Sequence, residues 1–306
     1  MQQLDQAYEW LSARYFGGVP ADNVAVVAGV LLSYVLAHGF QRIPTSVPAA
    51  KHVFSIVSTA ISYGIVQGHV DGVVHLAMAS VAVYLLMRSL RGRAMPQAVF
   101  AVAMLHLSYS HVQRQISEAQ NGRLQQDYTG AQMVFVMKVT SLANCIYDGQ
   151  RADPATLSAY QRRNAVDKVP GFLEYLGYVF FFPAFAVGPT FELATYRRMV
   201  QLDSRRVEGR LTRRAYARLL EGLVWMAVYV RYSHVTFAAM VDSPSAYARR
   251  SFVSTIIGVC GAGLIARAAY YAAWKMSEGA CVLAGLGFDG LDDHGAPMWT
   301  SVANID

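Results

Sequence analysis

The segment that decides the fold class is 131-AQMVFVMKVTSLANCIYDGQ-150. It is mostly apolar, and as a helix it would extend about 30 Å, which matches the hydrocarbon thickness of a bilayer. The whole chain shares this character, because 54% of its 306 residues are hydrophobic and only 15% are charged. A soluble domain has about 25% charged residues, so this chain has too few to cover a surface that faces water. The sequence therefore predicts an all-α, polytopic transmembrane helical bundle.

Several further segments approach the roughly 20 apolar residues that a membrane helix needs. With the opening segment, the candidate spans are 23–40, 52–67, 70–87, 94–111, 131–148, 171–190, 219–240 and 251–274. Several are short for a full span, so the pattern predicts seven or eight crossings, with some segments tilted or re-entrant. The mean hydropathy of the chain, +0.28, agrees with this class.

The first 20 residues do not resemble a secretory signal, because no apolar core follows a basic start. Instead Leu4, Tyr8, Leu11 and Tyr15 recur at helical spacing. This pattern predicts an amphipathic helix that lies in the bilayer interface over residues 1–20; a polar tail without fixed structure is the alternative.

Positive charge is concentrated in 196-YRRMVQLDSRRVEGRLTRRAYAR-218, which holds eight arginines. A basic connection between apolar spans is typical of the cytoplasmic side of a membrane, so we expect this loop to be cytoplasmic. Attraction of anionic lipid or CoA phosphates is a second interpretation. The net charge of +6 follows from such topology and does not indicate a nucleic-acid partner.

Polar residues form a stripe on the opening segment. At about 100° per residue, the polar side chains share an arc of about 120° on one helix face. They are Lys138, Ser141, Asn144, Cys145 and Asp148. Unpaired charge is costly in lipid, so the stripe should face protein or water. It either lines a cavity or locks two helices together through Lys138 and Asp148.

The segment 171–190 contains Pro183 and Pro189, which remove backbone donors and should break or kink a helix. Glu192 follows this segment, and Glu278 precedes another apolar stretch. On the span 251–274, small residues at Gly258, Gly261, Ala262 and Gly263 are typical of close helix contact.

The sequence lacks the short motifs of three common catalytic or nucleotide-binding classes. It contains no HExxH, GxSxG or GxxxxGK[ST] pattern, so no metal site is predicted. We expect its three cysteines, Cys145, Cys260 and Cys281, to be free buried thiols. Spacing alone predicts a membrane protein with a polar intramembrane cavity, which fits a transporter as well as an enzyme.

Four blocks carry a more specific resemblance. They are 138-KVTSLANCIYDG-149, 170-PGFLEYLGYVFFFPAFAVGPTFELATYRR-198, 274-WKMSEGACVLAGLGFDG-290 and 297-PMWTSVANID-306. In this order they resemble the membrane-bound O-acyltransferase family, in its lysophospholipid acyltransferase branch. The third block is similar to the branch pattern SEG…GLGFNG, with Asp289 where Asn is common. The resemblance is specific from about residue 130 to 306.

The resemblance implies transfer of an acyl chain from acyl-CoA, as co-substrate, to a lysophospholipid hydroxyl in phospholipid synthesis or remodelling. The resemblance implies that the reaction needs no cofactor. It also implies that the protein is a multi-pass protein of the endoplasmic reticulum membrane. The family's catalytic Asn and His follow the last block, which would place them beyond Asp306. We therefore expect no catalytic residue in this chain. On that expectation the chain is an incomplete N-terminal portion that is inactive alone.

The resemblance also gives the polar residues a role as lining of the reaction chamber. The candidates are Lys138, Ser141, Asn144, Asp148, Pro183, Gly188, Pro189, Glu192 and Glu278. We expect one domain, 1–306, in which 23–111 are peripheral helices, 131–290 are part of the acyltransferase core and 291–306 are loop. A transporter or a non-catalytic membrane scaffold is the alternative. A transporter predicts repeated broken helices, and only one proline-broken segment is present.

Overall fold

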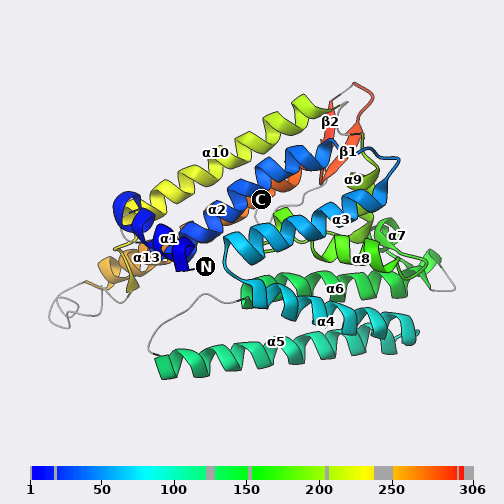
Figure 1. Cartoon of the computed structure of the whole chain (residues 1–306), viewed down its shortest axis with the longest axis horizontal. Coiled ribbons are helices and arrows are strands. Elements are labelled where there is room, and N and C mark those ends of the chain that lie inside the picture. The colour runs from blue at the N-terminus through cyan, green and yellow to red at the C-terminus, as the bar shows by residue number, and fades with distance from the viewer. Residues whose placement is uncertain are drawn as a thin grey trace.

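The computed structural model describes residues 2–16, 19–121, 128–150, 154–203, 207–237, 251–294 and 296–299. Most of this part of the chain is helical (Figure 1), which confirms the predicted all-α membrane bundle. The long helices are α1 (Gln2–Tyr15), α2 (Ala21–Gln41), α3 (Pro48–Thr59), α4 (Val70–Ser89), α5 (Ala94–Asn121), α6 (Thr129–Gly149), α10 (Glu208–Tyr232) and α13 (Phe252–Leu283). The short elements are η1 (Ala60–Val66), η2 (Pro154–Thr156), α7 (Ala159–Asn164), α8 (Phe172–Val179), η3 (Phe182–Ala184), α9 (Leu193–Gln201), β1 (Phe288–Leu291) and β2 (Pro297–Trp299).

Four helices are long and apolar enough to cross a membrane. They are α2, α3 continued by the π-helix η1, α4 and α13, and they coincide with four of the predicted spans. The predicted spans 94–111, 131–148 and 219–240 fall largely on α5, α6 and α10, which are also long but are interrupted by more polar residues. At 32 residues, α13 is about 48 Å long and exceeds the thickness of the hydrocarbon layer.

The segment 171–190 is not a continuous helix. It consists of the eight-residue α8, the short η3 and a loop that contains a cis Gly188–Pro189 bond. The break follows from the proline positions, because Pro183 has no N–H to donate to the carbonyl of Val179. The predicted break is confirmed, whereas the predicted helical span is wrong.

Two connections differ from expectation. The basic loop 196–218 is largely helical, because α9 and the first turns of α10 occupy it. The block 277–290 does not begin a new segment, since α13 continues to Leu283.

The tail 291–306 was expected to be loop. Instead it contains β2, which pairs antiparallel with β1. Residues 300–306, with Asp306 at their end, lie outside the described residues, so the predicted loop stays a prediction there.

The long helices alternate in direction. Figure 1 shows α2, α4, α6 and α13 ending on the side where α3, α5 and α10 begin. The described basic residues of this side come from helix ends and connections: Arg42, Lys51, Arg88, Arg91, Arg93, Arg162, Arg163, Lys168, Arg197, Arg198, Arg210, Arg213 and Arg214. The same side also carries eight carboxylates, at Asp148, Asp167, Glu174, Asp203, Glu208, Asp289, Asp292 and Asp293. Because these cations outnumber the carboxylates, we call this side the basic end. The opposite end carries more carboxylates than cations. Its carboxylates are Asp5, Glu9, Asp22, Asp71 and Glu118, and its cations are Arg14, Arg114 and Arg231.

An aromatic cluster fills the core around the broken segment. Phe181 packs edge-on against Phe40, Phe191 and Tyr196, with ring centroids 5.5–6.1 Å apart. Each such pair contributes about 0.5–1.5 kcal/mol beyond the area it buries. The cluster encloses the loop between α2, α3 and α9, which removes it from lipid.

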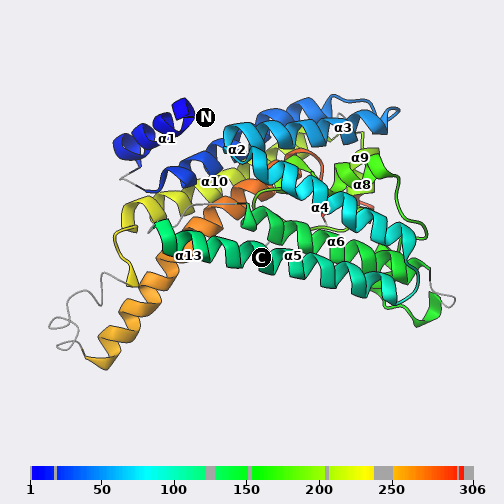
Figure 2. The same cartoon turned by 60° about the horizontal axis from the view of Figure 1, so that its bottom comes forward.

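Two contacts hold the helices α1 and α13 against the rest of the bundle. α1 is tied to the bundle because the Tyr8 hydroxyl donates to the Val66 carbonyl at 2.8 Å; the helix predicted for 1–20 is present over 2–15, and its place in the interface stays a prediction. α13 packs along α10, and its first half projects away from the other helices (Figure 2). Gly279 allows close approach, because a Cβ there would meet the Tyr34 hydroxyl and lie 2.7 Å from the Ala215 carbonyl oxygen.

Candidate functional site

Lys138 caps the broken helix α8. Its ammonium donates to the carbonyls of Tyr178 and Val179, at 2.7 and 3.3 Å. These carbonyls lie where α8 stops, so they lack the i+4 donors of a continuous helix. The ammonium also lies 4.3 Å from the Phe191 ring centroid and 4.8 Å from that of Tyr178. Lys138 is only 1% exposed, so its charge is balanced by carbonyl dipoles and aromatic faces.

Other side chains satisfy the next free carbonyls of the same segment. The Thr59 hydroxyl donates to the Phe180 carbonyl at 2.7 Å. The Ser277 hydroxyl lies 2.6 Å from the Pro183 carbonyl oxygen and also contacts that of Gly188. Thr59 comes from α3 and Ser277 from α13, so three helices hold the segment. Gly188 has φ +86°, a left-handed conformation that favours glycine.

Glu192 joins α6 to α7. Its carboxylate accepts hydrogen bonds from Ser141 at 2.7 Å, Tyr160 at 2.8 Å and Cys145 at 3.4 Å. Among the described residues these donors are neutral, and no cation contacts the carboxylate. The pKa of Tyr160 is raised above its ordinary value. The largest cause is partial burial of its hydroxyl, followed by its hydrogen bond to Glu192 and the charge of Glu192. The Glu192 carboxyl group therefore lies among neutral donors, one of which is the exposed Tyr160 side chain.

The stripe on α6 divides between three surroundings. Lys138, Ser141 and Cys145 face α8 and Glu192, as described above. Asp148 accepts from the Gln161 amide of α7 at 3.1 and 3.2 Å, so it does not form the alternative lock with Lys138. Asn144 lies on the exposed side and donates to the Thr140 carbonyl at 2.8 Å. The predicted arc thus faces protein except at its Asn144 edge.

Glu278 belongs to a separate ion cluster between α10 and α13. Its carboxylate lies 2.9 Å from Arg218 Nε and 3.3 Å from Lys275 Nζ. Glu221 contacts the same two cations, at 2.7 and 3.6 Å. Lys275 and Glu278 are both about 5% exposed, so the cluster locks the two helices where they pack.

At the basic end, the β-hairpin carries polar contacts that the sequence did not point to. Asp289 pairs with Arg163 at 2.8 Å and with Arg198 at 3.2 Å. The Arg214 guanidinium lies 4.4 Å from the Trp299 ring centroid, and its buried Nε has no hydrogen-bond partner within the described chain. Arg214 is therefore a stacked cation with donor capacity to spare.

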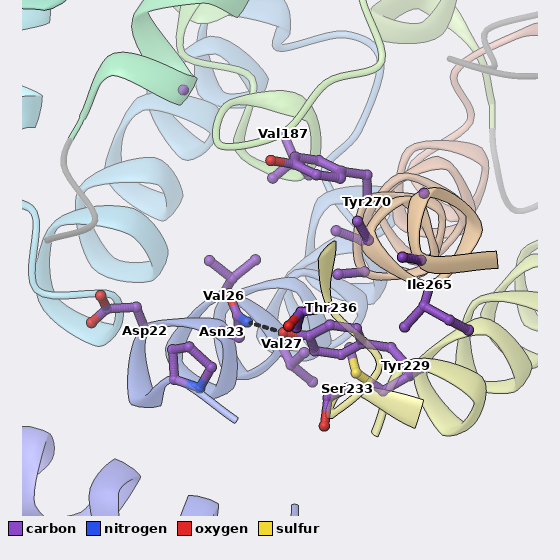
Figure 3. Close-up of a pocket in the computed structure, with 18 of the residues that line it drawn as sticks. Asp22, Asn23, Val26, Val27, Val187, Tyr229, Ser233, Thr236, Ile265 and Tyr270 are labelled. Atoms are coloured by element: carbon purple, nitrogen blue, oxygen red, sulfur yellow. Dashed lines mark hydrogen bonds between the residues drawn. The ribbon is translucent and has the colours of Figure 1, made fainter. Parts of the chain in front are cut away.

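A cavity of about 830 Å³ lies between α2, α6, α10 and α13. Figure 3 shows it with the hydrogen bond from the Asn23 amide to the Tyr229 hydroxyl, which measures 3.3 Å. None of the nine chamber candidates lines this cavity. Their role as chamber wall stays a prediction. Of the three cysteines, Cys145 and Cys281 are buried and free as expected, whereas Cys260 is exposed.

The His, Cys, Asp and Glu side chains of the described chain lie in pairs or singly. No three His, Cys, Asp or Glu side chains gather among the described residues in an arrangement that could hold a metal ion. His75 and His106 contact each other through their Nε2 atoms at 2.6 Å, and the Gln132 amide lies 2.9 Å from His106 Nδ1. This group links α4, α5 and α6 and can be satisfied by one tautomer of each ring.

Fold and site together define a polytopic helical membrane protein whose polar residues gather around a broken segment inside the bundle. The family model for membrane-bound O-acyltransferases matches residues 86–306. The chain therefore belongs to the membrane-bound O-acyltransferase family, which confirms the resemblance seen in the four sequence blocks.

Curated relatives place the similarity in one branch. A lysophospholipid acyltransferase of Schizosaccharomyces pombe is 34% identical, over 99% of this chain and 60% of the relative. One of Saccharomyces cerevisiae is 30% identical, over 94% and 50%. Lysophospholipid acyltransferase 5 of Bos taurus is 33% identical, over 58% and 37%. The chain thus spans about half the length of the curated relatives it matches.

The catalytic residues that the resemblance implies were expected beyond Asp306. The family match extends to Asp306 itself, but that residue and the six before it lie outside the described part of the chain. The expectation that the catalytic Asn and His follow Asp306 therefore stays a prediction, as does inactivity of the chain by itself.

Proposed function

We propose that the whole protein is an acyl-CoA-dependent lysophospholipid O-acyltransferase of phospholipid synthesis or remodelling. The observation that carries the proposal is similarity along 99% and 94% of this chain to two relatives named lysophospholipid acyltransferase. In the reaction, the acceptor hydroxyl oxygen attacks the thioester carbonyl carbon of acyl-CoA. A base takes the hydroxyl proton, the new ester bond forms, and the C–S bond breaks to release CoA as its thiol.

The described residues contribute structure to this reaction, and we assign none of them as the base. Lys138, Thr59 and Ser277 hold the broken segment in place. Glu192 fixes α7 against α6. A segment held in this way provides a rigid wall, which transfer between two bound substrates needs. We retain the nine candidates as wall residues of the proposed reaction chamber.

The basic end supports acyl-CoA as the donor, because CoA carries several phosphate charges. Arg214, with its unpartnered Nε and its stacking on Trp299, offers hydrogen-bond donors to an anion. We propose that this end is cytoplasmic, since basic residues gather on that side of membrane proteins, and that the membrane is that of the endoplasmic reticulum. Lys168→Cys at the basic end should then react with an impermeant maleimide from the cytoplasmic side, and Asp5→Cys should not; the reverse pattern would refute the orientation.

The function is tested with membranes from cells that express the complete gene product. Labelled oleoyl-CoA is supplied with lysophospholipids that carry choline, ethanolamine, serine, inositol or no headgroup. We expect labelled diacyl phospholipid that depends on both substrates. If the protein is present and no pair yields product, the proposal fails and a non-catalytic scaffold or a lipid transporter is favoured.

A variant pair tests the donor site within that assay. Arg214→Ala should raise KM for oleoyl-CoA about tenfold, which corresponds to about 1.4 kcal/mol, the order of one charge-assisted hydrogen bond. KM for the lysolipid should stay constant. Arg213→Ala is the matched control, because Arg213 is exposed on the same helix and makes no stacking contact that the structure describes. Equal behaviour of the two variants would remove Arg214 from the donor site.

A further inference from the structure

Two adjoining hollows lie at the basic end, where the turn between α4 and α5 meets the end of α6. The larger, of about 960 Å³, is bordered by the end of α4, the end of α6 and residues 167–169. The smaller, of about 430 Å³, lies between the start of α5 and the last two turns of α6. Tyr147 borders both, so we treat them together as the α4–α6 hollow.

Cations are the main polar groups of the α4–α6 hollow. Arg88, Arg91 and Lys168 border its larger part. Within the part of the chain that the structure describes, these three side chains form no hydrogen bond or ion pair. Arg93 borders the smaller part and donates to the neutral Tyr147 hydroxyl at 3.1 Å. The hollow therefore offers several cationic donors to a ligand.

The local charge of the hollow stays positive when its negative groups are included. Asp167 is the one carboxylate among the described residues that border it, so the four cations leave three formal positive charges. The helices α4 and α6 end here, and α5 begins here. Each helix end carries about half a charge, negative at a C-terminus and positive at an N-terminus, so roughly 2.5 positive charges remain. A ligand with two negative charges would balance most of this charge.

The smaller part of the hollow adjoins an apolar surface of α5. Phe100 borders it and is 55% exposed, and Met104 is exposed one turn further along the same helix face. Both residues belong to the predicted span 94–111, which places this surface beside lipid tails and the hollow at the level of the headgroups. Basic pockets between helices in this position bind anionic lipid headgroups.

We propose that the α4–α6 hollow binds a diacyl phospholipid of the surrounding bilayer whose headgroup ends in a phosphate monoester. The phosphate lies among Arg88, Arg91 and Lys168, and one acyl chain lies against Phe100. A phosphate monoester carries about −1.5 to −2 charges at pH 7, which matches the local charge. A phosphodiester with one charge matches it less well, and a zwitterionic headgroup does not match it.

This site lies apart from the acyl-CoA site proposed at Arg214. Figure 1 shows the start of α10 and the β-hairpin at one edge of the basic end, and α4 and α5 at the other edge. The inference therefore goes beyond the proposed function, and the lipid is a structural ligand of the fold.

The bound lipid adds a third link between α4 and the segment that leads into α8. Tyr84 of α4 donates to the Pro170 carbonyl at 3.0 Å, and Tyr175 of α8 donates to the Ser80 carbonyl at 3.1 Å. Lys168 lies two residues before Pro170. A phosphate that contacts this lysine and the arginines of α4 joins the same two elements, so we expect the lipid to stabilise the folded chain.

Thermal unfolding of the purified full chain in detergent micelles tests the proposal. Dioleoyl phosphatidic acid is titrated into the micelles, with dioleoyl phosphatidylglycerol, dioleoyl phosphatidylcholine and inorganic phosphate in parallel. At a phosphatidic acid concentration about a hundredfold above its dissociation constant, we expect the melting temperature to rise by about 5 °C. Phosphatidylglycerol should raise it less, and phosphatidylcholine and inorganic phosphate should leave it unchanged.

Two double variants provide a matched pair. Arg88→Gln with Arg91→Gln removes two exposed cations from the hollow, and Arg210→Gln with Arg213→Gln removes two exposed cations at the same spacing from α10. Both should fold, because exposed arginines contribute little to stability, and elution as a single symmetric peak verifies this. Native mass spectrometry gives the dissociation constant of phosphatidic acid. We expect the first variant to raise it at least about tenfold, the order of one charge-assisted hydrogen bond, and the second to leave it unchanged.

Four results would overturn the proposal, and none of them depends on acyl transfer. An equal rise in melting temperature with phosphatidylglycerol would remove the preference for a doubly charged headgroup. An equal rise with inorganic phosphate would identify a site for free phosphate. Equal dissociation constants in the two double variants would place the lipid elsewhere. Displacement of phosphatidic acid by an equal concentration of palmitoyl-CoA would assign the hollow to the acyl donor.

Discussion

Replacing Lys138 by methionine tests why a charged residue lies inside an apolar helix. Methionine keeps the length of the side chain and removes the ammonium. The carbonyls of Tyr178 and Val179 then lose the donor that the structure gives them at 2.7 and 3.3 Å. Each buried acceptor without a partner costs about 1–3 kcal/mol. Loss of the buried cation offsets part of this, because its desolvation cost disappears.

The expected net loss of stability is about 2–4 kcal/mol. For a chain of this size, about 2 °C of melting temperature corresponds to 1 kcal/mol, so the variant should unfold roughly 4–8 °C below the parent. The measurement is the fraction of monodisperse protein in detergent after heating, followed by fluorescence-detected size exclusion. Lys168→Met is the control, since Lys168 is exposed and its loss should change stability by no more than about 0.5 kcal/mol.

The same variant separates capping of α8 from a role in the proposed chamber. If capping is the role, Lys138→Met lowers the melting temperature, and the folded fraction of a complete protein retains its acyl transfer. If the chamber is the role, transfer per folded molecule falls while the melting temperature stays near that of the parent. An unchanged melting temperature would refute the argument that the two carbonyls need this lysine.

Two further predictions concern the packing of α10 on α13. Glu278→Gln should destabilise the protein by about 3–5 kcal/mol, because it removes a negative charge that pairs with the buried Lys275 ammonium. The control is Glu118→Gln, which breaks a partly exposed ion pair with Arg114. It should cost no more than about 1 kcal/mol by the same melting assay. Gly279→Ala should cost at least about 1–3 kcal/mol, because its Cβ would lie 2.7 Å from a backbone carbonyl oxygen, whereas Gly261→Ala should be neutral or stabilising by up to about 1 kcal/mol. Equal melting temperatures within either pair would contradict the corresponding contact.

The helices of the bundle were predictable because they depend on local composition. Runs of apolar residues located α2, α3 and α4 to within a few positions. They also located the start of α13, which continues to Leu283, beyond the predicted end at residue 274. Pro183 located the break after α8. Helical spacing also identified the polar face of α6 correctly. Each of these rests on residues that are neighbours along the chain, where helical periodicity is informative.

The partners of the polar residues were not predictable from periodicity. A helical wheel gives the face of Lys138 and does not reveal what lies opposite. One signal was available: a proline frees a carbonyl four residues earlier, and an unpaired lysine in an apolar helix needs acceptors. Joining these two facts could have paired Lys138 with Val179. Tyr160, which donates to Glu192 from α7, had no comparable signal.

The small residues of α13 illustrate a different limit. Gly261 and Gly263 have the composition of a helix contact, yet the structure leaves open space at both. Small side chains can admit a neighbouring helix or leave a cavity, and the sequence is the same in both cases. Only the placement of α2, α6 and α10 around α13 decides between them.

The broken segment explains the polarity of three side chains inside the bundle. Backbone that is not helical is tolerated at membrane depth only where protein or water satisfies it. Here the carbonyls of residues 178, 179, 180 and 183 accept from Lys138, Thr59 and Ser277, which come from α6, α3 and α13. These three side chains are at most 1% exposed, so their polarity is accounted for by the backbone that they serve. Glu192 is different, because its carboxyl group has only neutral donors among the described residues. It is therefore the candidate whose polarity most needs a functional reason.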